Sequence, residues 1–349
     1  MVKYIGSKRL LVPAILDAAA SLSGVRTVFD VFSGTARVGH AFKKAGYRVI
    51  ANDCLAFAHT LATCYVQADR QRVWRDAERI IAELNALPGR AGYVTEVFCR
   101  KARFFQPHNG ERIDAMRHRI DQLDLDDELR AVVLTSLIEA ADRVDSTTGV
   151  QMAYVKQWAP RSFNHIELRM PDVLPQARAG AGRALMADAL DAARSVHADL
   201  AYLDPPYNQH SYLGNYHIWE TIVRGDEPEH YGIACKRLDC RDRRSPFNSR
   251  TLAPEAMRTL IAAINARWII VSFNNEGFID RSQMEDLLAA RGPVCTIEHP
   301  YKRYVGAKIG IHNPQGRRVG RVGRLDNTEY LFVVGPTTPA REHALAGVA

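Results

Sequence analysis

Apolar runs, glycine turns and helical patterns alternate near the start of the chain. Residues 27–32 form a β-rich run, and Ser33-Gly34-Thr35 follows as a turn. A helical pattern over residues 36–45 leads to a second apolar run at residues 47–51. Strand, turn, helix and strand in this order make up the first βαβ unit of a doubly wound sheet. We therefore predict an α/β, Rossmann-like fold.

The same alternation returns in the second half of the chain. Buried strands are predicted at residues 198–203 and 268–273, and helices at residues 254–266 and 281–290. The apolar runs at residues 294–298 and 330–334 are typical of an antiparallel pair around a long loop rich in Gly and Arg. The predicted sheet is therefore mixed.

The middle of the chain has a different pattern. Residues 70–182 are mostly helical and end in a loop rich in Pro, Gly and Ala. We interpret them as an insertion large enough to form a subdomain. Residues 1–69 and 183–336 are then two parts of one domain, and residues 337–349 are a small, polar tail expected to be flexible.

The N-terminus and the cysteines favour a cytoplasmic protein. An apolar run follows Lys8 and Arg9, but Asp17 interrupts it, and the spacing favours an amphipathic helix over a signal peptide. No run approaches the roughly 18–20 apolar residues of a membrane span, so no membrane partner is expected. The six cysteines and the histidines show no metal-like grouping, which predicts free thiols and no metal.

The charge is uneven along the chain. Lys and Arg number 46 and Asp and Glu 39, so the net charge of +7 leans only slightly toward an anionic partner. Residues 301–324 are strongly basic and contain no acid, and residues 235–250 are also basic. Both segments are interpreted as a surface for phosphate groups, and a solvated loop is the alternative. The candidate DNA contacts are Arg237, Arg243, Arg244, Lys302, Arg303, Lys308, Arg317, Arg318, Arg321 and Arg324.

The most informative motif is Asp204-Pro205-Pro206-Tyr207, directly after a predicted buried strand. Ligands of open α/β sheets bind beyond the carboxyl ends of the strands. The prolines leave carbonyl groups that can only accept, the aspartate also accepts, and the tyrosine offers an aromatic face. This combination suits a planar group that carries an amino group. A Pro-Pro loop with a capping aspartate is the alternative.

A second group of residues suits a nucleoside-like ligand. Asp30 lies in the first strand run, Phe32 ends that run, and Gly34 follows in the turn. The chain contains neither a dinucleotide fingerprint nor a P-loop motif. Asp53, after the second strand, lies where doubly wound folds bind ribose hydroxyls, although a turn residue is equally compatible. Tyr212, Tyr216 and Trp219 are compatible with both a base pocket and the core.

In four ordered blocks the chain resembles the Dam-like, α-group family of S-adenosylmethionine-dependent DNA adenine-N6 methyltransferases. Residues 3–8 look like its N-terminal cofactor motif, and residues 30–36 are similar to its Phe-x-Gly-x-Gly motif, with Ala36 in place of the last glycine. The resemblance implies the catalytic role of Asp204, Pro205, Pro206 and Tyr207. It also implies cofactor roles for Tyr4, Lys8, Asp30, Phe32, Gly34, Asp53 and Asp188.

The resemblance further implies what the protein does. It implies methyl transfer to N6 of an adenine flipped out of a specific double-stranded DNA sequence, with residues 70–182 as the target recognition domain. A cognate restriction endonuclease and a monomeric state fit the same family. RNA or cytosine-N4 methyl transfer and a non-catalytic DNA-binding role are the alternatives. The absence of a Pro-Cys dipeptide argues against cytosine-C5 chemistry.

Overall fold

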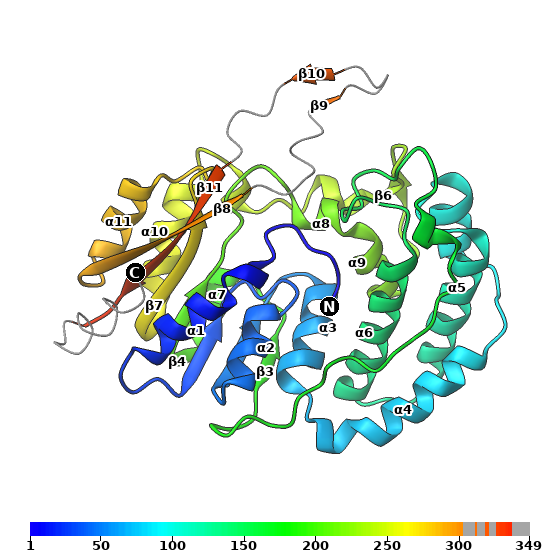
Figure 1. Cartoon of the computed structure of the whole chain (residues 1–349), viewed down its shortest axis with the longest axis horizontal. Coiled ribbons are helices and arrows are strands. Elements are labelled where there is room, and N and C mark those ends of the chain that lie inside the picture. The colour runs from blue at the N-terminus through cyan, green and yellow to red at the C-terminus, as the bar shows by residue number, and fades with distance from the viewer. Residues whose placement is uncertain (303–310, 313–317, 321–325, 337–349) are drawn as a thin grey trace.

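The computed structural model describes residues 1–302, 311–312, 318–320 and 326–336. Its centre is a seven-stranded sheet with the strand order β3-β2-β1-β4-β7-β11-β8 (Figure 1). β11 runs antiparallel to both of its neighbours, and the other neighbouring strands are parallel. The predicted mixed sheet is therefore confirmed. The strands are β1 (Thr27–Asp30), β2 (Arg48–Asn52), β3 (Arg183–Leu185), β4 (His197–Leu203), β7 (Asn265–Asn274), β8 (Val294–Lys302) and β11 (Asp326–Val334).

Several predicted boundaries differ from the structure. The predicted antiparallel pair is confirmed, but β8 and β11 are longer than the apolar runs, because their paired ends carry polar residues such as Glu329. β7 begins at Asn265, so the preceding helix is shorter than predicted. The sequence pattern missed β3, which has only three residues at the sheet edge.

Helices cover both faces of the sheet and extend beyond one side of it (Figure 1). Phe29, Ala201 and Val271 face a core formed with α7, α10 and α11, whereas Val28, Leu200 and Ile270 face the larger core on the other side. This alternation follows from the two-residue period of a strand. The helices are α1 (Val12–Ala20), α2 (Arg37–Lys44), α3 (Ala56–Ala62), α4 (Arg70–Ala86), α5 (Pro107–Gln122), α6 (Asp127–Val144), α7 (Ala189–Ser195), α8 (Tyr212–Asn215), α9 (His217–Arg224), α10 (Ala253–Ala263) and α11 (Arg281–Ala289).

Shorter elements connect these layers. The short 3-10 helices are η1 (Lys8–Leu10), η4 (Pro160–Phe163), η5 (Leu238–Arg241) and η6 (Pro246–Asn248). The short π helices are η2 (Thr63–Gln67) and η3 (Thr95–Lys101). Two small antiparallel pairs are formed by β5 (His230–Tyr231) with β6 (Lys236–Arg237), and by β9 (Ile311–His312) with β10 (Arg318–Gly320).

Residues 70–182 are mostly helical, as predicted, and they pack directly on the rest of the protein. α6 contacts α3, η2 and α9, and buried residues such as Leu137 belong to the same core cluster as Leu200 of β4. A shared core does not separate this segment from the sheet domain, so its boundaries remain a prediction from the sequence. Within the described part of the chain, no helix combines the length and the apolar character needed to cross a bilayer.

Candidate active site

A cavity of about 290 Å³ lies at the carboxyl ends of β1, β2 and β4. This size is at the lower limit of small-molecule pockets, roughly 300 Å³. The sequence places the candidate residues far apart, and the fold brings most of them to this one cavity. The predicted residues that line it are Tyr4, Lys8, Asp30, Phe32, Gly34, Asp53, Asp188, Asp204 and Pro206.

The loop after β1 forms one wall of the cavity. Gly34 has a φ of +51°, a conformation that a glycine adopts without a Cβ clash. A Cβ atom on Gly34 would lie 3.1 Å from the Tyr4 ring. Oδ2 of Asp53 accepts a hydrogen bond from the Gly34 amide, and Oδ1 accepts one from the Leu55 amide, each at 3.0 Å. Asp53 therefore joins the end of β2 to the β1–α2 loop.

Asp30 is a buried carboxyl group on the cavity wall. Asp30 is only 1% exposed, and no side chain among the described residues donates a hydrogen bond to its carboxylate oxygens, whereas the nearby Gly39 amide acts to lower its pKa. Burial, followed by the charges of Asp204 and Asp53, raises the pKa of Asp30 to about 8. A bound cation would stabilise the ionised form of this group.

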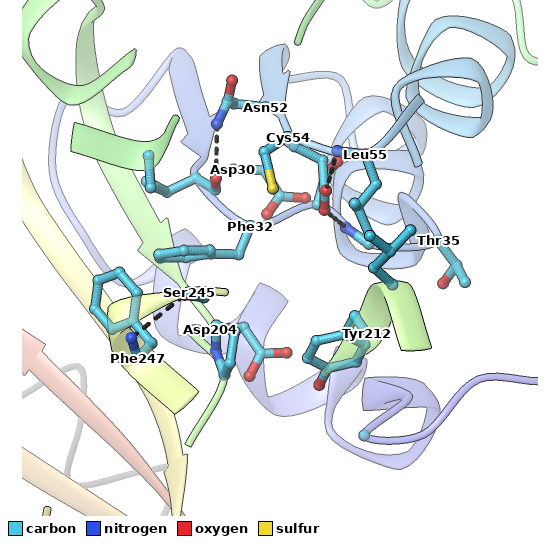
Figure 2. Close-up of a pocket in the computed structure, with 18 of the residues that line it drawn as sticks. Asp30, Phe32, Thr35, Asn52, Cys54, Leu55, Asp204, Tyr212, Ser245 and Phe247 are labelled. Atoms are coloured by element: carbon cyan, nitrogen blue, oxygen red, sulfur yellow. Dashed lines mark hydrogen bonds between the residues drawn. The ribbon is translucent and has the colours of Figure 1, made fainter. Parts of the chain in front are cut away.

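Aromatic side chains shape the two ends of the cavity. Phe32 meets Phe247 edge to face with their ring centroids 5.3 Å apart, and Figure 2 shows both rings on one side of the cavity. Tyr4 stacks on Tyr212, with centroids 5.2 Å apart. The pattern at residues 212–219 left a pocket or a core role open. Tyr212 lines the cavity, whereas Trp219 is buried in the core.

Asp204 directly follows β4, and its carboxylate points toward Tyr212 (Figure 2). Oδ1 of Asp204 lies 3.2 Å from Nζ of Lys8. Burial raises the pKa of Asp204, Lys8 lowers it and the charge of Glu329 raises it, and together they bring it to about 6. Burial would lower the pKa of Lys8, but the charges of Asp204 and Glu329 hold it above its ordinary value. Lys8 is therefore a partner of the Asp204 carboxylate in this structure.

Asp188 lies in the loop between β3 and α7, and it lines the same cavity as Asp204. Its side chain caps α7 by accepting a hydrogen bond from the Leu190 amide at 2.8 Å. Asn52 binds the same loop, because its Nδ2 atom donates to the carbonyl oxygens of Val31 and Ala187. The loop before α7 is thereby fixed to the ends of β1 and β2.

The structure corrects the interpretation of one predicted DNA contact. Arg237 is only 2% exposed, and its guanidinium group pairs with Asp226 and Asp239. It also donates to Oγ1 of Thr221. A buried and fully paired guanidinium group has no donor left for a phosphate, so Arg237 stabilises the β5–β6 region instead. A high local charge in the sequence cannot distinguish these two roles.

The other residues predicted to contact DNA do not share the buried position of Arg237. Arg243 and Arg244 are exposed and line the cavity, and Arg243 donates to the Cys54 carbonyl oxygen. Lys302 and Arg318 lie in β8 and β10. Outside the described residues lie Arg303, Lys308, Arg317, Arg321 and Arg324.

Sequence reasoning missed two residues at the site. Glu329 in β11 pairs with Lys8, with Nζ 3.3 Å from each carboxylate oxygen. Phe247 lines the cavity from η6, inside a segment that we interpreted only by its charge. The predicted strand began at Tyr330, one residue after Glu329. Extending it by its polar residues would have placed Glu329 at the same edge as Asp204, because an antiparallel strand starts where its parallel neighbours end.

Comparisons with known proteins agree with this geometry. Residues 4–274 match the model of a family described as D12 class N6 adenine-specific DNA methyltransferase. The chain is 30% identical over 326 residues to modification methylase StsI of Streptococcus sanguinis, which covers 88% of this chain and 49% of that protein. It is 27% identical over 346 residues to type II methyltransferase M.NlaIII of Neisseria lactamica, covering 96% and 99% of the two chains.

A third relative matches this chain at the same identity as StsI and over the same share of its own length. Type II methyltransferase M.FokI of Planomicrobium okeanokoites is 30% identical over 324 residues, covering 86% of this chain and 49% of that protein. The chain thus spans about half the length of the StsI and FokI proteins and nearly all of the NlaIII protein.

Proposed function

The chain belongs to the D12 class N6 adenine-specific DNA methyltransferase family, and from this we propose that it methylates N6 of adenine in a specific sequence of double-stranded DNA. The methyl donor that we propose is S-adenosylmethionine. The names of the StsI, NlaIII and FokI relatives suggest that the chain acts beside a cognate restriction endonuclease. We expect it to work as a cytoplasmic monomer.

The cavity fits this cofactor. The buried carboxyl group of Asp30 suits a cationic group, and the rings of Phe32 and Phe247, which line the cavity, suit an aromatic base. Asp53 lies at the end of β2, where doubly wound folds bind ribose hydroxyls. Tyr4 and Asp188 close the cavity from two other segments. When bound, S-adenosylmethionine supplies a methyl group on a positively charged sulfonium.

The catalytic motif fits an amino group as acceptor. The Asp204 carboxylate and the Pro205 carbonyl group can each accept a hydrogen bond from an exocyclic N–H. Such bonds favour a more tetrahedral nitrogen whose lone pair can attack. Asp204 then stabilises the positive charge that develops on N6. Pro206 stiffens the loop, and the Tyr207 ring offers a stacking face worth about 1–3 kcal/mol.

The base must leave the duplex to reach this motif. An adenine inside DNA hides its amino group, whereas Asp204 lies in a cavity lined by protein. We propose that Arg243, Arg244 and the basic residues of the 301–324 segment bind the DNA backbone. We also propose that residues 70–182 carry the base-reading contacts.

One observation carries this proposal most strongly: Asp204 and the cofactor motif residues Lys8, Asp30 and Asp53 meet in one cavity. The test is to incubate the chain with duplex DNA and methyl-labelled S-adenosylmethionine, and to digest the product to nucleosides. We expect N6-methyladenine, and sequencing of the methylated sites gives the recognition sequence. N4-methylcytosine in the digest, or labelling of RNA but not DNA, would contradict the proposal.

A further inference from the structure

Lys8 lies between two carboxylates that come from different strands. Its Nζ atom is 3.2 Å from Oδ1 of Asp204 and 3.3 Å from both oxygens of Glu329. The Lys8 residue is 5% exposed, and its ammonium group lies 5.7 Å from the centroid of the Tyr207 ring. One buried cation is therefore shared by a catalytic and a non-catalytic acid.

The position of Glu329 follows from the antiparallel direction of β11. Glu329 pairs in register with Asn274 of β7 and His299 of β8, near the end of the strand that meets the carboxyl edge of the sheet. It is 8% exposed. Among the described residues, Lys8 is the one cation within ion-pair distance of Glu329. A buried carboxylate without such a partner would be costly, so the pair has a clear physical origin.

We propose that Glu329 is a positioning residue, which shares the Lys8 ammonium group with Asp204 and so leaves the Asp204 carboxylate available to the target amino group. This inference rests on the proposed function only for the role that it gives Asp204. Nothing in the comparisons assigns a role to Glu329.

The net charge of Lys8, Asp204 and Glu329 explains the effect of a shared ammonium group on Asp204. Lys8 and Asp204 alone would form a neutral pair, and the ammonium donors would compete with the substrate N–H for the carboxylate oxygens. With Glu329 present, the three groups carry a net charge of −1 when ionised. The Lys8 ammonium group contacts Asp204 at Oδ1. An excess of negative charge at this point favours a reaction in which positive charge arrives on the acceptor nitrogen.

Several other ionisable groups lie near Asp204 or Lys8 and form the surroundings in which Asp204 titrates. Tyr4, Tyr202 of β4, Asp30 of β1 and Tyr212 of α8 interact electrostatically with Asp204, and Tyr207 interacts with Lys8. None of them forms an ion pair with the Lys8 ammonium group, which Glu329 shares with Asp204. The Glu329 variants leave all of these groups in place, so a shift of the Asp204 titration in those variants reports the change at Glu329.

A direct titration of Asp204 tests the proposal without any need for activity. The protein is labelled with ¹³C-carboxyl aspartate, and the Asp204 signal is assigned by its loss in Asp204→Asn. Wild-type Asp204 should titrate near its pKa of about 6. Glu329→Gln should lower the midpoint by about one pH unit, since a negative charge has been removed. Lys8→Gln should raise it.

Two further variants keep the test decisive. Glu298→Gln is the matched control, because this exposed glutamate of β8 pairs with Arg281 and should leave the midpoint unchanged. Glu329→Asp keeps the charge but draws the carboxylate away from Lys8, so it should lower the midpoint by a smaller amount than Glu329→Gln. It takes the place of the glutamine variant if that variant does not fold, and an unmoved or raised midpoint then counts in the same way. An Asp204 midpoint that stays in place or rises in Glu329→Gln overturns the inference.

The enzymatic readout separates this inference from the proposed function. If the chain methylates adenine, the acid limb of the single-turnover rate should shift to lower pH in Glu329→Gln and to higher pH in Lys8→Gln. A purely structural role would reduce the rate without opposite shifts. If wild-type protein methylates no DNA, the proposed function fails, whereas the ¹³C titration still decides whether Glu329 acts on Asp204.

Discussion

Nζ of Lys8 lies 3.2 Å from Oδ1 of Asp204, so the N-terminal motif and the strand-end motif meet in one buried ion pair. In the resemblance to the Dam-like family, residues 3–8 belong to the cofactor site and residues 204–207 belong to the site of the target base. Their contact means that the position of the N-terminal segment directly affects the carboxylate of Asp204, which we propose as the catalytic group. Changes near Lys8 should therefore alter the methyl-transfer step as well as cofactor affinity.

Asp204→Asn should separate catalysis from cofactor binding. The amide keeps the size of the side chain but loses the charge that stabilises the methylated amino group, so we expect the single-turnover rate to fall by about 10²–10³-fold. Affinity for S-adenosylmethionine, measured by calorimetry, should stay within a few-fold. Asp191→Asn, on the exposed surface of α7, is the control. Undiminished turnover of Asp204→Asn would contradict the mechanism.

Asp30 should couple cofactor binding to pH. Its pKa is about 8 because the group is buried, and a cationic ligand favours the ionised form. Binding therefore requires loss of a proton below pH 8, and affinity should rise about five-fold between pH 7 and pH 8 relative to Asp30→Asn. Calorimetry in buffers of different ionisation enthalpy would measure the released proton. An identical pH dependence in the two proteins would exclude this role.

The same shift has a consequence for the cofactor-free protein. A carboxyl group with a raised pKa binds its proton more tightly in the folded state, so its contribution to stability decreases as the pH rises from about 4 to 8. The free energy of unfolding of wild type should therefore decrease over this range relative to Asp30→Asn. Denaturant titrations at several pH values would show it.

The carboxyl edge of the sheet was the most predictable part of this protein. Asp30 lay within the first predicted strand, Asp53 and Asp204 followed two others, and parallel strands of one sheet bring their carboxyl ends together. Glu329 escaped prediction because its strand begins with polar residues, and apolar periodicity marks only the buried part of a strand. The burial of Arg237 escaped because its two acidic partners are recognisable only after the chain has folded.

Arg237 and Arg244 should respond differently to the same substitution. Arg237→Ala removes the buried partner of Asp226 and Asp239, which keep their contacts with Arg224, and this should destabilise the protein by about 2 kcal/mol. Arg244 is exposed, so Arg244→Ala should change stability by less than about 0.5 kcal/mol and should weaken DNA binding. Denaturant unfolding and DNA titration would measure the two effects. Equal stability losses would show that the burial of Arg237 has no energetic weight.

Gly34→Ala should disturb the cofactor site through its contact with Tyr4. The left-handed φ of +51° costs an alanine about 1–2 kcal/mol, and the new Cβ atom would lie 3.1 Å from the Tyr4 ring. We expect about ten-fold weaker binding of S-adenosylmethionine. Gly232→Ala is the matched control, since it has a φ of +69° and no atom within 4 Å of the added Cβ. Equal cofactor affinities in the two variants would rule out a specific Tyr4 contact.

The basic segment at residues 301–324 should contribute to DNA affinity through phosphate contacts. Each lost contact reduces the slope of log K against log salt by about 0.9, so a variant with four arginines changed to glutamine should lose up to about 4 units of slope. The four positions are Arg317, Arg318, Arg321 and Arg324. The control changes four exposed arginines that lie outside the proposed DNA-binding segments and do not line the cavity, namely Arg26, Arg194, Arg258 and Arg267.

Fluorescence anisotropy with duplex DNA between 50 and 200 mM salt would give both slopes, over a range in which phosphate-binding proteins lose affinity by orders of magnitude. The slope should flatten in the first variant only, because both variants lose the same net charge but only the first loses charge from the acid-free segment. Equal flattening in both variants would mean that total charge determines DNA affinity. An unchanged slope in the first variant would place the phosphate contacts elsewhere, with Arg243 and Arg244 at the cavity wall as the next positions to test.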